Sequence, residues 1–141
     1  AICASLQVLG HWYEDARGAR VPGMGVLDIT TLPQGHRAIG ELVTVPLVEG
    51  LTQPLSGFEN HGGGTILGED AAPLGRVIEV AYDGAVQGSI IATYMHGPAL
   101  ARNPELADLL LQRATGMSLP PLEVPGVAQL RAERLSGVQL P

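Results

Sequence analysis

Apolar residues recur along the chain with two different spacings, which predict helices and strands in alternation. Between Leu6 and Tyr13 they recur every three or four residues, which predicts a helix from about residue 4 to 15. Ala1 and Ile2 are expected to end a strand in front of this helix. Short apolar or alternating runs predict further strands at 26–30, 41–47, 76–82 and 88–94.

Local breakers refine this pattern. Pro46 places the 41–47 strand at a sheet edge or at a strand end. The strand at 88–94 carries no charge, so it is expected to be more buried than the one at 76–82. Residues 50–88 are rich in glycine and are expected to form mostly short strands and loops.

The clearest helix signal lies at residues 103–116. Asn103 is a plausible N-cap, Pro104 suits the first helical position, Glu105 suits the positive helix end and Gly116 suits the stop. From Pro120 onward, prolines interrupt the chain, and a short helix is predicted only at 130–135.

Strands, a strand-to-helix corner and helices in alternation predict an α/β layered domain. A doubly wound fold needs several strand-helix units before its nucleophile corner, and none precedes residue 1. We therefore expect residues 1–141 to be the C-terminal portion of one domain whose front part is missing.

Composition narrows the functional classes. Of 141 residues 45% are apolar and 16% charged, which is typical of a globular domain. The net charge is −6, and scattered arginines without any lysine make no basic stripe, so nucleic acid is not an expected partner. One cysteine suits a reducing compartment, and no apolar run is long enough to insert in a membrane, so we expect a cytoplasmic protein.

Cys3 is the candidate nucleophile. A helix N-terminus stabilises a thiolate, and the small residues Ala4 and Ser5 leave room for a substrate. The N–H of Ala4, which follows the nucleophile, would point at a developing oxyanion. The alternative is a buried core cysteine.

His96 is the candidate base. It lies just past an apolar strand, and α/β sheets carry their sites at the carboxyl ends of strands. A lone histidine there is often structural, but a cysteine and a histidine both at strand ends favour a catalytic pair.

The stretch GFENHGGGT at 57–65 raises the question of a metal site. Glu59 and His61 with the distant His96 have weak spacing for zinc, so no metal is expected. We expect Glu59, Asn60 and His61 to brace a loop near the active site instead, with the adjacent glycines allowing unusual backbone angles.

The motifs AICASLQVLG, GFENHGG and IIATYMHGPALARNPELADLLL, in this order, resemble class I, triad-type glutamine amidotransferases of the cobyric acid synthase-like branch. The motifs WYEDARG, VLDITT, GHRAIGE and GAVQGSIIATYMHGP extend the resemblance over nearly the whole chain. Within this branch the chain is most similar to the glutaminase subunits of lipid II isoglutaminyl synthases. The resemblance implies a flavodoxin-like α/β fold and no cofactor.

The resemblance also implies a reaction. Cys3 would attack the side-chain carboxamide of L-glutamine, and His96 would take the thiol proton and pass it to the departing ammonia. Water would then hydrolyse the thioester. The ammonia would go to a Mur-ligase-like, ATP-dependent subunit, the partner in a heterodimer, which amidates D-glutamate of lipid II in peptidoglycan synthesis.

Two further residues are assigned to the substrate by the same resemblance. Arg37 would pair with the substrate's α-carboxylate, and its alternative is a solvated surface arginine. Gln7 would help to shape the substrate pocket, and its alternative is a polar residue on the exposed side of the helix.

The chain departs from the family pattern in four places. The segment that supplies the second oxyanion donor is expected to be missing. Ser5 replaces a glycine, Pro98 stands where triad members carry a glutamate, and the loop between Val77 and Gly84 is short. Two alternative functions therefore stay open: a non-catalytic remnant that binds a ligase partner, and the amidotransferase portion of a cobyrinate-type amidase.

Overall fold

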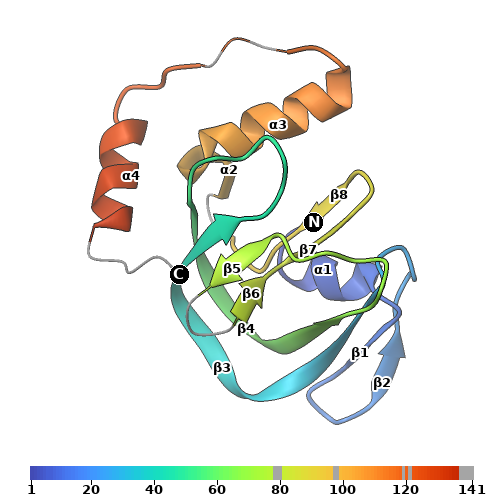
Figure 1. Ribbon diagram of the computed structural model, residues 1–141. Helices are drawn as coiled ribbons and strands as arrows, with labels where there is room; N and C mark the ends of the chain where they lie inside the picture. The colour runs from blue at the N-terminus through green and yellow to red at the C-terminus, as the bar shows by residue number, and fades with distance from the viewer. Residues whose placement is uncertain (78–80, 97–98, 119, 121, 137–141) are drawn as a thin grey trace.

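The computed structural model describes residues 1–77, 81–96, 99–118, 120 and 122–136 (Figure 1). Its elements, in chain order, are helix α1 (Ala4–Leu9), strands β1 (Trp12–Glu14), β2 (Arg20–Pro22), β3 (Ile29–Pro46), β4 (Leu55–Leu67), β5 (Gly75–Val77), β6 (Ala81–Asp83), β7 (Ala85–Gln87) and β8 (Ile90–Ala92), and helices α2 (Ala99–Arg102), α3 (Pro104–Thr115) and α4 (Val127–Leu135).

A long antiparallel ribbon of β3 and β4 organises the fold. Its pairing runs from Ile29 opposite Leu67 to Thr44 opposite Leu55, with a register shift between Pro33 and Ala38. Strand β1 lies parallel to the start of β3, and β2 pairs with β1. Strand β5 pairs with the end of β3 and with β6, so the described residues form a mixed six-stranded sheet beside a separate β7–β8 hairpin.

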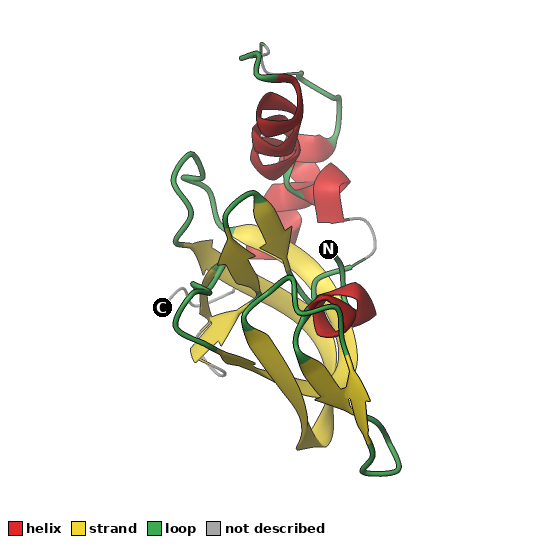
Figure 2. Ribbon diagram, turned by 90° about the vertical axis from the view of Figure 1, so that its right-hand side faces the viewer, coloured by secondary structure: helices red, strands yellow, loops and turns green. Residues whose placement is uncertain are grey.

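The helices sit in two places around this sheet. Helices α2, α3 and α4 gather at one end of the molecule, whereas α1 lies apart from them beside the strands (Figures 1 and 2). Arg102 of α2 and Arg134 of α4 both pair with Glu41 of β3, which ties the helical end to the ribbon. No helix in the described ranges is both long and apolar enough to cross a membrane.

The core consists of two apolar clusters, and β3 contributes to both. Side chains alternate across a strand, and β3 buries alternate residues at its two ends while its middle is more exposed. One cluster contains Leu42, Leu51, Leu55, Leu74, Ile91, Met95 and Leu106, and the other contains Leu6, Leu27, Ile29, Ala85, Ala92 and Tyr94. The segment that follows β8 therefore contributes to both clusters.

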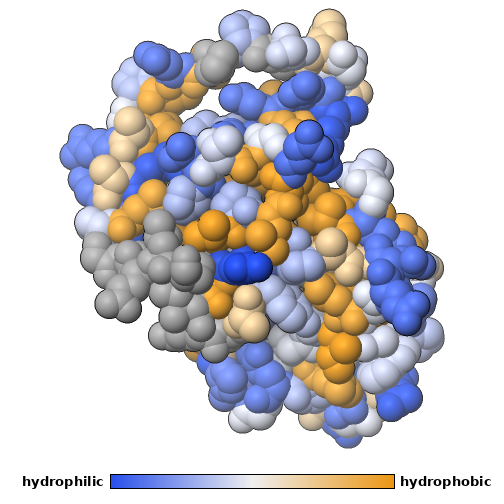
Figure 3. Space-filling view, in the orientation of Figure 1, coloured by the Kyte–Doolittle hydropathy of each residue, from blue (hydrophilic) through white to orange (hydrophobic). Residues whose placement is uncertain are grey.

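Polar and apolar residues, blue and orange in Figure 3, are interspersed over the face that this view shows. Large apolar side chains exposed in the described chain include Met24, Ile39 and Leu122.

The predicted helix over residues 4–15 is too long. Helix α1 ends at Leu9, and Trp12–Glu14 is strand β1. A Cβ on Gly10 would lie 2.7 Å from the Ile29 carbonyl oxygen, so only glycine lets the chain pass this close to β3. Pairing with β3 then overrides the helical spacing of the apolar residues.

The expectation of short strands and loops for residues 50–88 is wrong at Leu55–Leu67, which form one continuous strand. Here glycine gives room for neighbours. A Cβ on Gly57 would lie 2.5 Å from Met95 Cβ, and a Cβ on Gly63 would lie 2.5 Å from Gln7 Nε2.

Two other strand predictions need correction. Residues 25–28 form bends, and β3 begins only at Ile29. The single strand expected at 76–82 is a hairpin instead, in which Gly75–Val77 pairs with Ala81–Asp83, while residues 78–80 lie outside the described chain.

The remaining element predictions are confirmed in outline. The 41–47 strand is the last part of β3, which ends at Pro46. Residues 91–93 around the end of β8 are buried. Helix α3 begins at Pro104 and ends before Gly116, which is left-handed with φ 70°. The structure is mixed α/β with a central sheet, as predicted.

Asn103 does not cap α3 as predicted, because its side chain makes no capping hydrogen bond. Its carboxamide is buried and binds the backbone N–H and carbonyl of Ser56 on β4, both at 2.8 Å, and the Ala99 carbonyl at 2.7 Å. A side chain able both to donate and to accept can satisfy a strand end in this way.

Candidate active site

Cys3 lies at a strained corner between a strand end and helix α1. Ile2 bridges Thr93 in parallel, and the Cys3 N–H donates to the Thr93 carbonyl at 2.8 Å. Cys3 has φ 51° and ψ −116°. Non-glycine residues rarely adopt such angles, which cost about 1–3 kcal/mol and cluster at functional sites. The predicted strand-to-helix corner is confirmed, and it has the sharp turn of a nucleophile elbow.

The Cys3 side chain is half-buried, at the edge of the apolar cluster around Leu6. It is therefore not sealed in the core, as the alternative interpretation required. In the first turn of α1 the Ser5 N–H donates to Ile2 and the Leu6 N–H to Cys3. Among the described residues no acceptor binds the Ala4 N–H.

His96 lies three residues beyond the partner of Cys3. Its N–H donates to the Phe58 carbonyl on β4 at 2.9 Å, and its ring meets the Phe58 ring edge-on at 5.9 Å between centroids. Because three extended residues span at most about 10 Å, Cys3 and His96 are joined through one short segment, residues 93–96. No hydrogen bond connects their side chains among the described residues.

Arg37 lies beside the same face of β4 as His96. Its Nε donates to the Asn60 side-chain oxygen at 2.6 Å, on the exposed surface. Asn60 and Phe58 are two residues apart on a regular strand, so their side chains point to the same face about 7 Å apart. Phe58 contacts His96 and Asn60 holds Arg37, which brings the predicted base and the predicted carboxylate ligand to one face.

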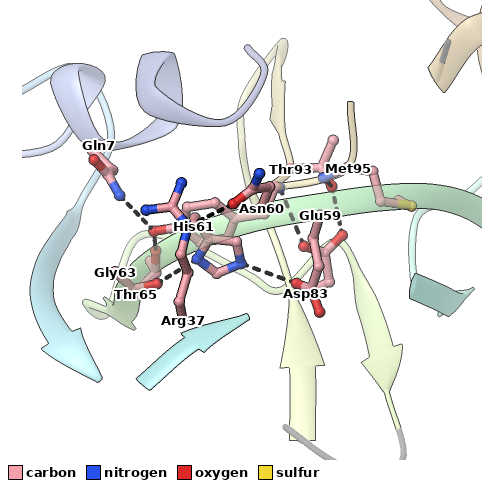
Figure 4. Close-up of polar contacts among 11 residues, drawn as sticks. Gln7, Arg37, Glu59, Asn60, His61, Gly63, Thr65, Asp83, Thr93 and Met95 are labelled. Carbon is pink, nitrogen blue, oxygen red and sulfur yellow. Dashed lines mark hydrogen bonds and ion pairs between the residues drawn. The ribbon is translucent and has the colours of Figure 1, made fainter. Parts of the chain in front are cut away.

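Gln7 turns toward the interior, not to the exposed side of α1. Its Nε2 donates to the Tyr94 hydroxyl at 3.3 Å, and that hydroxyl also contacts Thr65 Oγ1 at 2.9 Å (Figure 4). Burial raises the pKa of Tyr94, so this phenol stays neutral. The bond to Tyr94 fixes where the Gln7 carboxamide lies.

His61 lies within strand β4, not in the loop that was predicted for residues 59–61. Its ring stacks on Tyr94 with centroids 3.6 Å apart, its Nδ1 contacts the Gly63 carbonyl at 2.8 Å, and its Nε2 contacts Glu59 at 2.9 Å. A carbonyl only accepts, so Nδ1 carries a hydrogen. In the described ranges no three His, Cys, Asp or Glu residues are grouped to hold a metal ion.

Asp83 is the residue of this region that the sequence analysis missed. It is 4% exposed and accepts hydrogen bonds from Thr93 Oγ1 at 2.6 Å and from the Tyr94 N–H at 3.3 Å. Burial raises the pKa of Asp83 to about 6, against these two hydrogen bonds, which lower it. The dipeptide Asp83–Gly84 reads as an ordinary turn, so no sequence pattern marked this carboxyl.

Comparison with known proteins identifies the family to which this chain belongs. Residues 1–104 match the model of the CobB/CobQ-like glutamine amidotransferase domain. The chain belongs to this family. The resemblance predicted from the sequence motifs is therefore confirmed.

Within the CobB/CobQ-like family, the chain is similar to two lipid II isoglutaminyl synthase (glutamine-hydrolyzing) subunits called GatD. It is 38% identical to that of Streptococcus pneumoniae over 81% of this chain and 46% of that protein. It is 33% identical to that of Staphylococcus aureus over 95% of this chain and 57% of that protein. The chain thus spans about half the length of these relatives.

Cobyric acid synthases are similar as well. That of Pelotomaculum thermopropionicum is 37% identical over 86% of this chain and 27% of that protein. A solved glutamine amidotransferase from Thermotoga maritima shares the fold, with a TM-score of 0.51 and 16% identity over 94% of this chain and 55% of that one. The predicted fold class is confirmed by this match.

Proposed function

We propose that this chain hydrolyses L-glutamine as the glutaminase part of an amidotransferase. The Cys3 sulfur attacks the side-chain carbonyl carbon, and His96 takes the thiol proton and gives it to the leaving nitrogen, which departs as ammonia. Water then cleaves the γ-glutamyl thioester, releasing glutamate and restoring the thiol.

One observation supports this proposal above the others. Cys3 is held in a strained, positive-φ corner, half exposed, and its N–H is bonded to Thr93, on the segment that ends in His96. A structural cysteine gains nothing from a conformation that costs about 1–3 kcal/mol. A nucleophile gains exposure above the helix and the adjacent Ala4 N–H as an oxyanion donor.

The substrate's other end is assigned to Arg37. Asn60 binds the Arg37 Nε, and no described residue binds the two terminal nitrogens of the guanidinium, which can hold a carboxylate in a fork. We assign the glutamine α-carboxylate to this fork. We assign Gln7, which Tyr94 fixes in place, to the substrate site as well.

The acceptor is proposed from the relatives. The two GatD proteins are named as subunits of lipid II isoglutaminyl synthase. We therefore propose that ammonia passes to a Mur-ligase-like, ATP-dependent partner that amidates D-glutamate of lipid II, in the cytoplasm. The match to cobyric acid synthase makes a corrinoid side-chain carboxylate the competing acceptor.

Ammonia release from glutamine tests the reaction. It is measured on the full-length protein with its ligase partner, for wild type, Cys3→Ala and His96→Ala. Each of the two variants is expected to lose at least about 10³-fold in kcat, because nucleophile and base act as one unit. His11→Ala is the matched control, since its exposed ring is paired with Asp28 and, in the part of the chain that the structure describes, with no other side chain.

Wild-type rates in both site variants would contradict the assignment. Supplying lipid II or a cobyrinic acid together with ATP then separates the two acceptors, since only the true acceptor is amidated.

A further inference from the structure

Residues 93–96, which link the two proposed catalytic residues, are held by backbone hydrogen bonds at both ends but, within the described chain, not at their two middle N–H groups. At one end the Thr93 N–H donates to the Ala1 carbonyl, and at the other end the His96 N–H donates to the Phe58 carbonyl. Between them, the N–H groups of Tyr94 and Met95 are bound by side chains. Asp83 accepts from Tyr94 at 3.3 Å, and the Thr93 hydroxyl accepts from Met95 at 3.0 Å.

Asp83 also orders the Thr93 hydroxyl. Thr93 Oγ1 donates to Asp83 Oδ2 at 2.6 Å, which directs its lone pairs toward the Met95 N–H (Figure 4). One buried carboxylate therefore controls both middle amides of the segment, one directly and one through Thr93. All three residues from Thr93 to Met95 are at most 5% exposed, so no solvent replaces these bonds.

We infer that Asp83 is a positioning residue that sets the placement of Cys3 relative to His96 by holding residues 93–96. This inference rests on the proposed glutamine hydrolysis. The carbonyl that accepts the Cys3 N–H belongs to Thr93, and His96 follows three residues later. A shift in the backbone between them changes the distance over which the proton moves, and a misplacement of about 1 Å costs on the order of a hundredfold in rate.

A carboxylate suits this position better than the amide of the same shape. Asp83 receives two hydrogen bonds, one on each oxygen, from Thr93 and from Tyr94. An asparagine has one acceptor oxygen, so if that oxygen accepts from the Tyr94 N–H, its NH₂ group faces the Thr93 hydroxyl. The hydroxyl would then accept from the NH₂ group and turn its own hydrogen away, which removes the order that Asp83 imposes on it. The carboxylate accepts from both groups and fixes the direction of the hydroxyl hydrogen, at the cost of its own desolvation.

The test compares kcat and KM for glutamine in the full-length protein with its partner. Asp83→Asn and Thr93→Val are expected to lower kcat by about 10- to 100-fold with KM within about twofold, because the substrate contacts of Arg37 lie on another element. Thr93→Ser keeps the hydroxyl and is expected to retain wild-type kcat. Asp108→Asn, in the middle of α3, is the matched control for loss of an acidic charge.

The double variant Asp83→Asn with Thr93→Val should lose no more than the stronger single variant, because both break one unit. Thermal unfolding of each variant shows that the folded protein is being assayed. Should Asp83→Asn fail to fold, the Thr93→Val and Thr93→Ser pair decides alone.

Two results would overturn the inference. One is a folded Asp83→Asn or Thr93→Val protein with wild-type kcat. The other is a Thr93→Ser protein as slow as Thr93→Val, which would make the effect one of packing. Cys3→Ala in the same series separates the two proposals. If Cys3→Ala hydrolyses glutamine normally, the proposed function fails, and the positioning role of Asp83 fails with it. If Cys3→Ala is inactive and Asp83→Asn is as fast as wild type, only the positioning role fails.

Discussion

Two buried polar side chains, Asn103 and Asp83, each hold a backbone segment of another element, and they do so with different chemistry. Asn103 joins the start of α3 to Ser56 with both donors and acceptor satisfied. Asp83 joins β6 to Thr93 and Tyr94 and can only accept. The Asn103 side chain is neutral, whereas Asp83 has a carboxyl group whose charged form is destabilised by burial.

The difference separates stability from function in this fold. A neutral amide that is fully paired stabilises at no electrostatic cost. A buried carboxyl raises the free energy of the folded state at neutral pH, so its presence points to a task that packing alone does not explain. The hydrogen bonds of Asn103 should therefore mainly affect the free energy of unfolding, and those of Asp83 should mainly affect the rate of glutamine hydrolysis.

The largest expected effect on stability is that of Asn103→Ala. It removes three buried hydrogen bonds and leaves the Ser56 N–H and carbonyl unpaired, so the free energy of unfolding should fall by about 3 kcal/mol. Urea unfolding measures this loss, and kcat per folded molecule should stay unchanged. Arg131 Nη1 also donates to the Asn103 side-chain oxygen, at 3.2 Å. A loss below about 1 kcal/mol would show that water or Arg131 satisfies the backbone groups that the amide leaves behind.

The pH dependence of the unfolding free energy distinguishes Asp83, which titrates, from the neutral Asn103. Folding raises the pKa of Asp83 from 3.8 to about 6, so the folded state binds this proton more tightly. The resulting stabilisation is complete below about pH 4 and is lost as the pH rises through about 6, up to about 3 kcal/mol. The charged or polar groups that face this carboxyl from β4 are Glu59, which raises its pKa, and His61, which lowers it.

The measurement is therefore a difference between wild type and Asp83→Asn in urea unfolding from about pH 4 to pH 7. Wild type should lose stability relative to the variant across this range. Parallel curves would contradict a buried, titrating Asp83.

Arg37→Ala tests the proposed binding of the glutamine α-carboxylate, which involves neither Asn103 nor Asp83. Loss of the carboxylate fork should raise KM for glutamine by about tenfold or more and leave the unfolding free energy unchanged, because Arg37 is exposed. Steady-state kinetics measure the change. Arg37→Lys should recover only part of the affinity, and a KM equal to wild type in both variants would make Arg37 a surface residue.

The smallest effect concerns the strain at Cys3. Glycine adopts φ 51° without a steric penalty, so Cys3→Gly should unfold with about 1 kcal/mol more free energy than Cys3→Ala. Both variants should be inactive. Equal unfolding free energies would contradict the strained corner.

The sequence predicted what depends on local rules. Helix α3 follows from Pro104, its apolar spacing and Gly116, and the corner at Cys3 follows from small residues between a strand end and a helix. The family was predicted from the order of several motifs, and the match of residues 1–104 confirms it.

What the sequence could not give are contacts between distant segments. Gly10 and Gly63 read as breakers, yet each is a close approach to another element, to β3 and to Gln7. Asn103 reads as a helix cap and serves as a partner for Ser56 instead. Asp83 carries no motif, because its significance lies in the fold around Thr93.

The central claim is that Cys3 and His96 form one glutamine-cleaving unit, and an electrophilic analogue of glutamine tests it most directly. A glutamine analogue with a diazoketone in place of the carboxamide is mixed with the full-length protein, and the modified residue is located by mass spectrometry. The account predicts labelling of Cys3, prevented by excess glutamine and at least about tenfold slower in His96→Ala. An unlabelled Cys3 in a protein that still releases ammonia from glutamine, or labelling that glutamine does not slow, would contradict it.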